Sequence, residues 1–343
     1  MLDYLLERSL IPKLLYRASI YFQLRSRLKN EKKLFNHSSG QNKLDFINQL
    51  KSSKIALCTD EANEQHYEVP TDFYKKILGP HLKYSCCYYQ NDCDLQQAEI
   101  NMLELYCERL KLQDGLRILD LGCGWGSFSL YVAKKFPNCS ITAVSNSATQ
   151  KAYIDEQGYE NINVITCDIN QLQLDEQYDR IISIEMFEHI RNYEALLSRI
   201  TSWLVDDGYL FVHHFCHKYL IYPFNAEDSW MARNFFKDGI MPSEDLLLYF
   251  TNNFVVQGKW RINGSHYKNT CYDWLRNLYK NKQAIISIFE NHYTSPNLHY
   301  QYWDLFIRAC AQLFAYHKGR EWFVVHYVFK KINKSIPRIE NTF

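Results

Sequence analysis

The sequence predicts an α/β fold in which a doubly wound, mostly parallel sheet carries helices on both faces. An apolar run at 116–121 has the pattern of a buried strand. It ends in glycines at alternate positions, Gly122, Gly124 and Gly126, and a helical pattern follows at 127–136. Further short apolar runs then alternate with helical patterns, which is how parallel strands are connected. Together these observations predict the doubly wound class.

The remaining elements follow in a regular order. The helix after the second strand begins at Ser147, which forms a capping box with Gln150. The helix after the fourth strand is expected to start at the N-cap Asn192 and to stop at Gly208. Strands are expected at 116–121, 140–145, 162–167, 179–185, 209–215, 254–262 and 322–330. Helices are expected at about 13–29, 45–51, 72–78, 94–110, 127–136, 269–290 and 298–316.

The chain is expected to consist of two parts. Residues 1–80 form a helical N-terminal cap, and residues 81–343 form the main domain. An aromatic-rich, irregular segment and the two long helical stretches make up a helical substrate lid, inserted at about 217–316. This lid is expected to cover the carboxyl edge of the sheet, where ligands of such sheets bind.

The first 33 residues are basic and amphipathic. Between Lys13 and Lys29 a set of apolar side chains recurs at helical spacing, and basic side chains take the other faces. The apolar set is Leu14, Ala18, Tyr21, Phe22 and Leu28; the basic set is Lys13, Arg17, Arg25, Arg27 and Lys29. Two interpretations stay open: a surface helix packed on the main domain, or transient docking on an anionic membrane.

Composition narrows the function classes. The 343 residues carry a net charge of +1, so bulk charge indicates no nucleic-acid partner. The eleven cysteines are scattered without a CxxC pair, no secretory signal is visible, and no apolar run reaches the ~18 residues that a membrane span needs. We therefore expect a reduced, cytoplasmic enzyme, with peripheral membrane contact as the open alternative. The 26 tyrosines and 20 phenylalanines also allow an aromatic-lined pocket for a flat or cationic substrate.

The glycine turn after the first strand is typical of a nucleotide-like ligand site, because a Cβ there would hold the ligand away from the backbone. Its spacing differs from the G-x-G-x-x-G of dinucleotide-binding proteins, and no Lys-Ser/Thr follows as in a P-loop. Asp120 lies inside the strand end. A carboxylate there would repel a phosphate but suits a cationic or amine-bearing ligand.

The next strand ends supply further polar groups. Asn146 follows the second strand and can hydrogen-bond a ribose diol, although an acid is more usual at this place. Asp168 follows the third strand and can accept from an adenine amine while Ile169 covers the ring. After the fourth strand, two carboxylates and an imidazole lie within five residues: Glu185, Glu188 and His189. Such a cluster can position an amine or accept a proton.

A histidine-rich run, HHFCH, ends the fifth strand. Strand alternation turns His213 and Phe215 to one face and His214 and Cys216 to the other, so these residues cannot close a tetrahedral metal site. We predict no metal, and one histidine of the run facing the pocket.

Several motifs together resemble the cyclopropane-fatty-acid synthase family of S-adenosylmethionine (SAM)-dependent enzymes, in particular its coclaurine N-methyltransferase-like branch. They are KYSCCYY at 83–89, AEINMLELYCERL at 98–110, DLGCGWG at 120–126, AVSNSATQK at 143–151, IEMFEHIRNYE at 184–194, LFVHHFCHK at 210–218 and WRINGSHYKNT at 260–270. The resemblance implies a class I SAM-methyltransferase (Rossmann-like) fold with SAM as cosubstrate. It further implies that SAM is held by Tyr84, Ser85, Asp120, Gly122, Gly124, Asn146, Gln150, Asp168, Ile169 and Met186.

In cyclopropane synthases a bound bicarbonate acts as the general base, and the resemblance maps its partners onto this chain. They are the backbone at Cys86, and the side chains of Glu188, His214 and Tyr267. The cysteine which that family places near its C-terminus corresponds to Cys310. Two positions depart from the synthases and favour the N-methyltransferase branch. Glu185 replaces a small residue, and His266 replaces an Asp.

The sequence therefore predicts a methyltransferase that moves a methyl group from SAM to the nitrogen of a small aromatic or alkylamine. Glu185, Glu188 and His189 would orient the amine or take its proton, with His214, Tyr267 and Cys310 in the same site. The alternative is cyclopropanation of an unsaturated phospholipid acyl chain. A SAM-binding scaffold without turnover and a nicotinamide oxidoreductase are weaker hypotheses. The acceptor is not named by the sequence, and a homodimer is left open.

Overall fold

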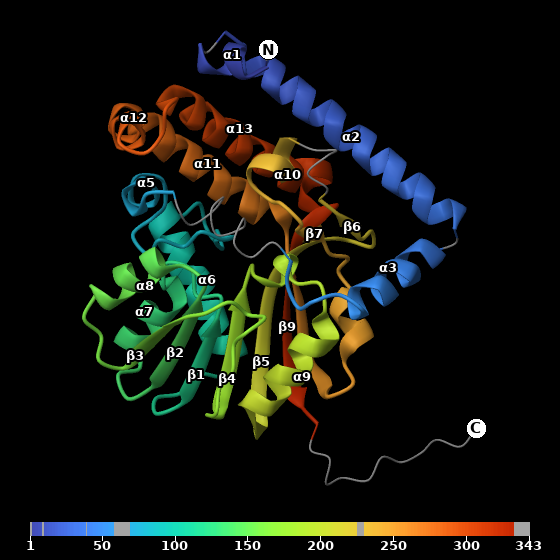
Figure 1. The fold of residues 1–343 in the computed structure, drawn as a ribbon, viewed down its shortest axis with the longest axis vertical. Coiled ribbons are helices and arrows are strands. Elements are labelled where there is room, and N and C mark those ends of the chain that lie inside the picture. Colours follow the sequence, from blue (N-terminus) through green and yellow to red (C-terminus); the bar gives the residue numbers. More distant parts are fainter. Residues whose placement is uncertain (1, 9, 39, 58–68, 225–229, 333–343) are drawn as a thin grey trace.

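The computed structural model describes residues 2–8, 10–38, 40–57, 69–224 and 230–332. Its centre is a seven-stranded sheet with strand order β3-β2-β1-β4-β5-β9-β8 (Figure 1). The strands are β1 (Arg117–Leu121), β2 (Ser140–Ser145), β3 (Ile162–Thr166), β4 (Tyr178–Ile184), β5 (Leu204–His217), β8 (Phe254–Ile262) and β9 (Trp322–Lys331). β6 (Tyr222–Pro223) and β7 (Ile240–Met241) pair separately.

The sheet is mostly parallel, as predicted. β3, β2, β1, β4 and β5 are joined by parallel pairing, whereas β9 pairs antiparallel with both β5 and β8. The chain order starts at β1 in the middle of the sheet, moves outward to β3, and then crosses back to β4 on the other side. Ligands of open α/β sheets bind at the carboxyl edge beside such a reversal. The site is therefore expected at the ends of β1 and β4.

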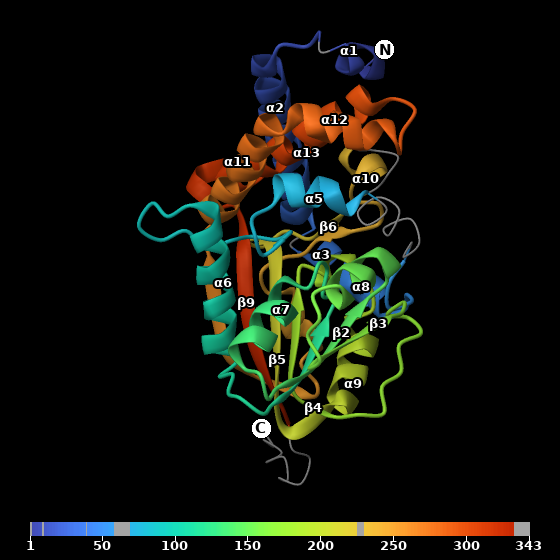
Figure 2. The same cartoon turned by 90° about the vertical axis from the view of Figure 1, so that its left-hand side faces the viewer.

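Helices cover both faces of the sheet (Figure 2). Alternate residues of each strand face opposite cores: Ile118 and Phe211 belong to the core with α6 and α7, and Leu119 and Leu210 to the core with α9 and α3. These helices are α3 (Gln41–Lys51), α6 (Leu95–Arg109), α7 (Ser127–Lys135) and α9 (Tyr193–Trp203), with α8 (Ala148–Asp155) after β2. Burial on both faces explains why each parallel strand is a continuous apolar run in the sequence.

A layer of helices lies across the carboxyl edge of the sheet (Figure 1). It contains α5 (Thr71–Ile77), α10 (Trp230–Asn234), α11 (Gly264–Lys280), α12 (Lys282–Glu290) and α13 (Pro296–Ala315). Short 3-10 turns complete the chain: Phe187–His189, Leu246–Phe250 and Tyr316–Gly319. The range 217–316 that was assigned to the lid also contains β8, which is the edge strand of the main sheet. Two separate segments, before and after β8, therefore lie over the carboxyl edge.

The N-terminal helices α1 (Leu2–Glu7) and α2 (Lys13–His37) pack against α13, where Leu6, Tyr16 and Ile20 are buried. The apolar stripe predicted for α2 is wrong, because the buried set lies on another face. Leu14 is 75% exposed and Phe22 is 64% exposed. Of the predicted stripe, Leu28 alone is buried.

Several basic side chains of α2 bind acids or rings of the main domain. Lys13 Nζ lies 3.8 Å from the buried carboxylate of Asp304. Lys32 Nζ lies 2.8 Å from the buried carboxylate of Glu321. Arg27 lies over the ring of Tyr222, 4.7 Å from its centroid. These contacts support the interpretation of α2 as a helix packed on the main domain. No helix within the described ranges is long and apolar enough to cross a membrane.

Several predicted helix bounds are wrong: α2 continues to His37 rather than ending near Lys29, and α3 begins at Gln41 rather than at Asp45. The helix after β4 ends at Trp203 rather than at Gly208, since β5 already begins at Leu204. The extended backbone lets Asp206 and Asp207 reach Lys331 and Lys330 of β9 at 3.3 and 2.8 Å. The stretch predicted at 269–290 consists of two helices, separated at Asn281, and the first begins at Gly264 because Asn263 caps it through the N–H of Ser265.

Candidate active site

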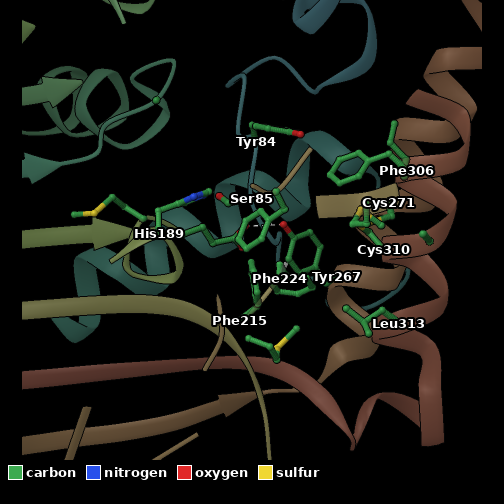
Figure 3. Close-up of a pocket in the computed structure, with 18 of the residues that line it drawn as sticks. Tyr84, Ser85, His189, Phe215, Phe224, Tyr267, Cys271, Phe306, Cys310 and Leu313 are labelled. Carbon is green, nitrogen blue, oxygen red and sulfur yellow. Dashed lines mark hydrogen bonds between the residues drawn. The ribbon is translucent and has the colours of Figure 1, made fainter. Parts of the chain in front are cut away.

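A cavity of about 950 Å³ lies between the carboxyl ends of the strands and the helices above them. Its walls come from β1, β2 and β4 on the sheet side and from α11 and α13 on the other side, and α2 contributes a further apolar wall. Figure 3 shows His189 projecting from the sheet side, with Tyr267, Cys271 and Cys310 facing it from the helices. This volume lies at the upper end of the range that is typical of small-molecule sites in proteins.

The glycine turn forms one end of this cavity. Gly122, Gly124 and Gly126 all have positive φ angles, of +85°, +54° and +74°. A Cβ at Gly122 would lie 2.9 Å from Met186, whereas a Cβ at Gly124 would enter open space in the cavity. The turn therefore exposes its backbone to a ligand at Gly124.

All the residues predicted to hold SAM line this cavity. They are Tyr84, Ser85, Asp120, Gly122, Gly124, Asn146, Gln150, Asp168, Ile169 and Met186. Burial raises the pKa of Asp120 to about 7, although the hydroxyl of Ser129 donates to its Oδ2 at 2.7 Å. Within the described residues, Asp120 Oδ1 and Gln150 Nε2 are buried without a hydrogen-bond partner. Buried polar atoms of this kind are suited to hydrogen-bond a polar ligand in the cavity.

Glu185 is the centre of the acceptor side of the cavity. It directly follows β4 in a left-handed backbone conformation, with φ +50°, which is rare for a residue with a side chain. Its Oε1 accepts from the Cys86 N–H at 2.9 Å and lies 3.0 Å from His213 Nε2. Its Oε2 accepts from the Tyr267 hydroxyl at 2.6 Å. Burial raises its pKa, and the Cys86 N–H, Lys83 and the Tyr267 hydroxyl oppose that effect.

His189 and Cys310 also line the cavity, and Cys271 lies beside Cys310. Burial lowers the pKa of His189 to about 4, with Arg191 adding to the effect, so its imidazole is neutral at pH 7. The His189 ring packs against Phe236 with a centroid separation of 4.6 Å. Burial raises the pKa of Cys310 to about 12, so this thiol is protonated at pH 7.

Two predicted catalytic residues do not line the cavity. Glu188 is fully buried, and its Oε1 accepts from the Phe215 N–H at 2.7 Å. Burial and the charge of Glu185 raise the pKa of the Glu188 carboxyl well above its usual range. His214 turns to the other face of β5, where its ring stacks on Tyr327 at 6.2 Å. The resemblance selected His214, but the neighbouring His213 contacts Glu185.

The histidines of the HHFCH run have separate partners. His213 contacts Glu185, His214 contacts the Phe215 carbonyl, and His217 contacts Glu321. In the part of the chain that the structure describes, no group of three or more His, Cys, Asp or Glu side chains could hold a metal ion.

A family model described as mycolic acid cyclopropane synthetase matches residues 57–321. The chain belongs to this family. A relative, (S)-coclaurine N-methyltransferase from Thalictrum flavum subsp. glaucum, is 38% identical over 340 residues, which cover 95% of this chain and 94% of the relative. Cyclopropane-fatty-acyl-phospholipid synthase from Escherichia coli strain K12 is 28% identical over 264 residues, which cover 76% of this chain and 66% of the relative.

A solved structure of coclaurine N-methyltransferase bound to N-methylheliamine and SAH has the same fold. It superposes with a TM-score of 0.91 at 38% identity, covering 96% of this chain and 99% of that chain. These similarities confirm the predicted family and the class I SAM-methyltransferase fold. They also confirm the prediction of a SAM-dependent methyltransferase with SAM as cosubstrate.

Proposed function

We propose that the enzyme transfers the methyl group of SAM to the nitrogen of a small amine that carries an aromatic or alkyl group. The observation that carries this proposal is the position of Glu185. Its carboxylate lines the cavity and accepts hydrogen bonds from the Cys86 N–H and the Tyr267 hydroxyl. By the resemblance, these are two of the four groups that would bind bicarbonate in a cyclopropane synthase. The other two, Glu188 and His214, do not line the cavity.

This arrangement favours N-methylation over cyclopropanation. A synthase needs an exchangeable base in the site, and here a side chain already fills the hydrogen bonds that would hold one. An amine, by contrast, carries positive charge before it loses its proton and again after methylation, and a fixed carboxylate stabilises that charge. The relatives named as N-methyltransferases of coclaurine act on an amine of this class, which also supports the proposal.

The residues at the glycine turn fit SAM. The open space at Gly124 admits a ligand close to the backbone, and the unpartnered Asp120 Oδ1 and Gln150 Nε2 are an acceptor and a donor facing the same end of the cavity. We propose that Asp120 and Gly124 hold the amino-acid part, Asn146 and Gln150 the ribose, and Asp168 and Ile169 the adenine. When bound, SAM supplies a methyl group on a positively charged sulfur.

The acceptor side acts mainly by orientation. Glu185 would accept a hydrogen bond from the amine and hold its lone pair toward the glycine turn. His189 lines the same cavity as a neutral imidazole at pH 7, and it would help to orient the amine without adding a second positive charge beside SAM. Phe215, Phe306 and Tyr267 also line the cavity and would pack on an aromatic ring of the substrate while excluding water. Cys310 would form part of the cavity lining without carrying a charge.

Labelled SAM tests the proposal against two extracts, one of small amines and one of total lipid. We expect label in the amine extract, and loss of turnover with retained SAH binding in His189→Gln. His299→Gln is the matched control, since this half-buried imidazole stacks on Tyr293 and does not line the cavity. Label in the lipid extract, in a product that depends on bicarbonate, would instead assign cyclopropanation.

Two finer expectations from the sequence are peripheral membrane contact and a homodimer, and the exposed face of α2 concerns the first of them. This face presents Leu14, Tyr21 and Phe22 beside Arg17 and Arg25. We propose that it is the contact surface for anionic lipid, and that any homodimer leaves the active site complete within one chain. Co-sedimentation with anionic vesicles tests the first expectation, and light scattering of the purified enzyme tests the second. The cytoplasmic location stays a prediction from the sequence.

A further inference from the structure

A chain of polar side chains leads from Glu185 into the interior between α6 and the sheet. Glu185 Oε1 lies 3.0 Å from His213 Nε2, and His213 Nδ1 lies 2.9 Å from His326 Nε2. His326 Nδ1 contacts a guanidinium nitrogen of Arg109, the last residue of α6. His213 and His326 face each other across the β5–β9 ladder, and both are fully buried. Neither histidine nor Arg109 lines the cavity.

Both imidazoles are neutral. Burial lowers the pKa of His213 well below its usual range, and the nearby Lys83 adds to the effect. Burial does the same to His326, with His213 and Arg109 as further causes. A neutral imidazole has one N–H donor and one acceptor nitrogen. The hydrogen bonds of the chain therefore all run in one direction, from donor to acceptor. That direction is set by an end group that can only donate or can only accept.

The two ends fix the same direction. The Arg109 guanidinium can only donate, so His326 Nδ1 accepts and the proton of His326 is on Nε2. That N–H donates to His213 Nδ1, which leaves the proton of His213 on Nε2, pointing at Glu185. At the other end, an ionised carboxylate can only accept. The Tyr106 hydroxyl lies 2.8 Å from the same Nδ1 of His213, where it also can donate.

We propose that Arg109, His326 and His213 are positioning residues, which hold the Glu185 carboxylate oriented toward the amine. The proposal rests on the proposed function, because it assigns Glu185 the acceptor side of the cavity. The three residues act through Glu185 and touch neither substrate. The chain transmits orientation and partial charge rather than a proton, since arginine cannot take up a proton at its far end.

The burial of this chain is hard to explain by stability alone. Four polar groups taken out of water stabilise a fold no better than apolar side chains of the same volume would. A fixed direction of donors, however, orients a carboxylate that must stay ionised in a buried site. Trp260 of β8 covers the Arg109 guanidinium at 4.6 Å from the ring centroid, so the outer end of the chain is shielded as well.

Nitrogen NMR of protein labelled with ¹⁵N-histidine tests the direction without any substrate. We expect His213 and His326 as neutral Nε2–H tautomers, identified by the signals that disappear in His213→Gln and His326→Gln. In Arg109→Met, which removes the fixed donor, we expect both signals to shift toward a mixture of tautomers. Nδ1–H tautomers or imidazolium signals in the wild-type enzyme would overturn the proposal.

Steady-state kinetics test the effect on Glu185. We expect Arg109→Met to lower kcat for the amine by about tenfold, as for loss of a charge-assisted hydrogen bond, with KM for SAM and SAH affinity unchanged. Arg109→Lys keeps a donor and should recover part of the rate. The control is Arg180→Met, which removes another half-buried arginine, bonded to the Leu110 carbonyl at 2.7 Å next to Arg109.

The two experiments separate the possible failures. Wild-type kcat in Arg109→Met, or an equal loss of kcat in Arg180→Met, would overturn the positioning role. If the wild-type enzyme methylates no amine but shows the expected tautomers, the proposed function fails while the direction of the chain stands. If it methylates amines but shows the other tautomers, the chain is wrong and the proposed function stands.

Discussion

Replacing Glu185 by glutamine removes the charge of this side chain and keeps its shape. If the amide oxygen takes the place of Oε1, the bonds from Cys86 N–H and His213 Nε2 persist, at 2.9 and 3.0 Å in the wild-type enzyme. The amide NH₂ then faces the Tyr267 hydroxyl, which can rotate to accept. The main loss is electrostatic, because a hydrogen bond to a charged group contributes about 1.5–3 kcal/mol and a neutral one about 0.5–1.5 kcal/mol.

We therefore expect kcat for the amine to fall by roughly 10- to 100-fold, which corresponds to about 1.4–2.7 kcal/mol. The fold should not suffer. Burial of the Glu185 charge is itself costly, as its raised pKa indicates, so the free energy of unfolding should stay within about 1 kcal/mol of the wild type or increase.

The assay combines initial rates with labelled SAM, SAH titration by calorimetry and thermal unfolding. Glu244→Gln is the matched control, because this carboxylate is also buried but binds Arg261, at 2.6 Å, and does not line the cavity. The control should keep the wild-type kcat. Undiminished kcat in Glu185→Gln would refute the reasoning, and so would a parallel loss of SAH binding and Tm, which would make Glu185 a structural residue.

Three further predictions concern other parts of the molecule. Gly124→Ala should lower the free energy of unfolding by about 1 kcal/mol because of the positive φ at this residue. It should also weaken SAH binding, measured by calorimetry, far more than the control Gly158→Ala, since Gly158 has a positive φ but lies outside the cavity. The pKa of Asp120 is raised from 3.8 to about 7, so its contribution to stability is present below pH 4 and lost as pH rises through 7. Asp120→Asn should remove this fall, of up to about 1.4 kcal/mol per pH unit, from urea-unfolding curves. Glu321→Gln removes the charge that pairs with Lys32 and should expose α2 to limited proteolysis at protease concentrations that leave the wild type intact; unchanged cleavage would show that this ion pair is not needed to hold α2 on the main domain.

The sheet and the polar residues at its carboxyl edge could be predicted from the sequence, because both depend on local patterns. Parallel strands are buried on both faces, so each one is a short apolar run, and β2 begins and ends at the predicted residues 140 and 145. Ligands bind at the carboxyl ends of such strands, so reading the residue after each strand identified Asn146 and Asp168 as cavity residues.

The acceptor side was harder to predict, since it depends on how distant segments pack. Whether Glu188 or Glu185 faces the cavity is decided by the 3-10 turn at Phe187–His189, which directs Glu188 to the backbone of β5. The alternation of β5 separated His213 from His214, but it could not say which face carries the site. His326 lies more than a hundred residues from both, and no local pattern links it to Glu185.

The face that α2 buries could not be predicted from the helix itself. Two sets of apolar side chains recur there at helical spacing, and the predicted stripe is the one with Leu14 and Phe22. Contact with α13 selects the set with Tyr16 and Ile20 instead. The buried acids that bind Lys13 and Lys32 lie almost three hundred residues away in the chain, so nothing near α2 in the sequence indicates them.

Because the backbone at Glu185 is left-handed, a single substitution at this residue would connect the two acceptor chemistries of the family. Glycine adopts a φ of +50° without strain, so Glu185→Gly removes the carboxylate and also relaxes the backbone. The Cys86 N–H and the Tyr267 hydroxyl would then point into a gap the size of a small anion. Formate or bicarbonate added to the buffer should fill it and restore part of the lost rate, a chemical rescue that Glu185→Gln, with the gap still filled, should not show. The same two donors can thus bind either the carboxylate of a side chain or an anion from solution.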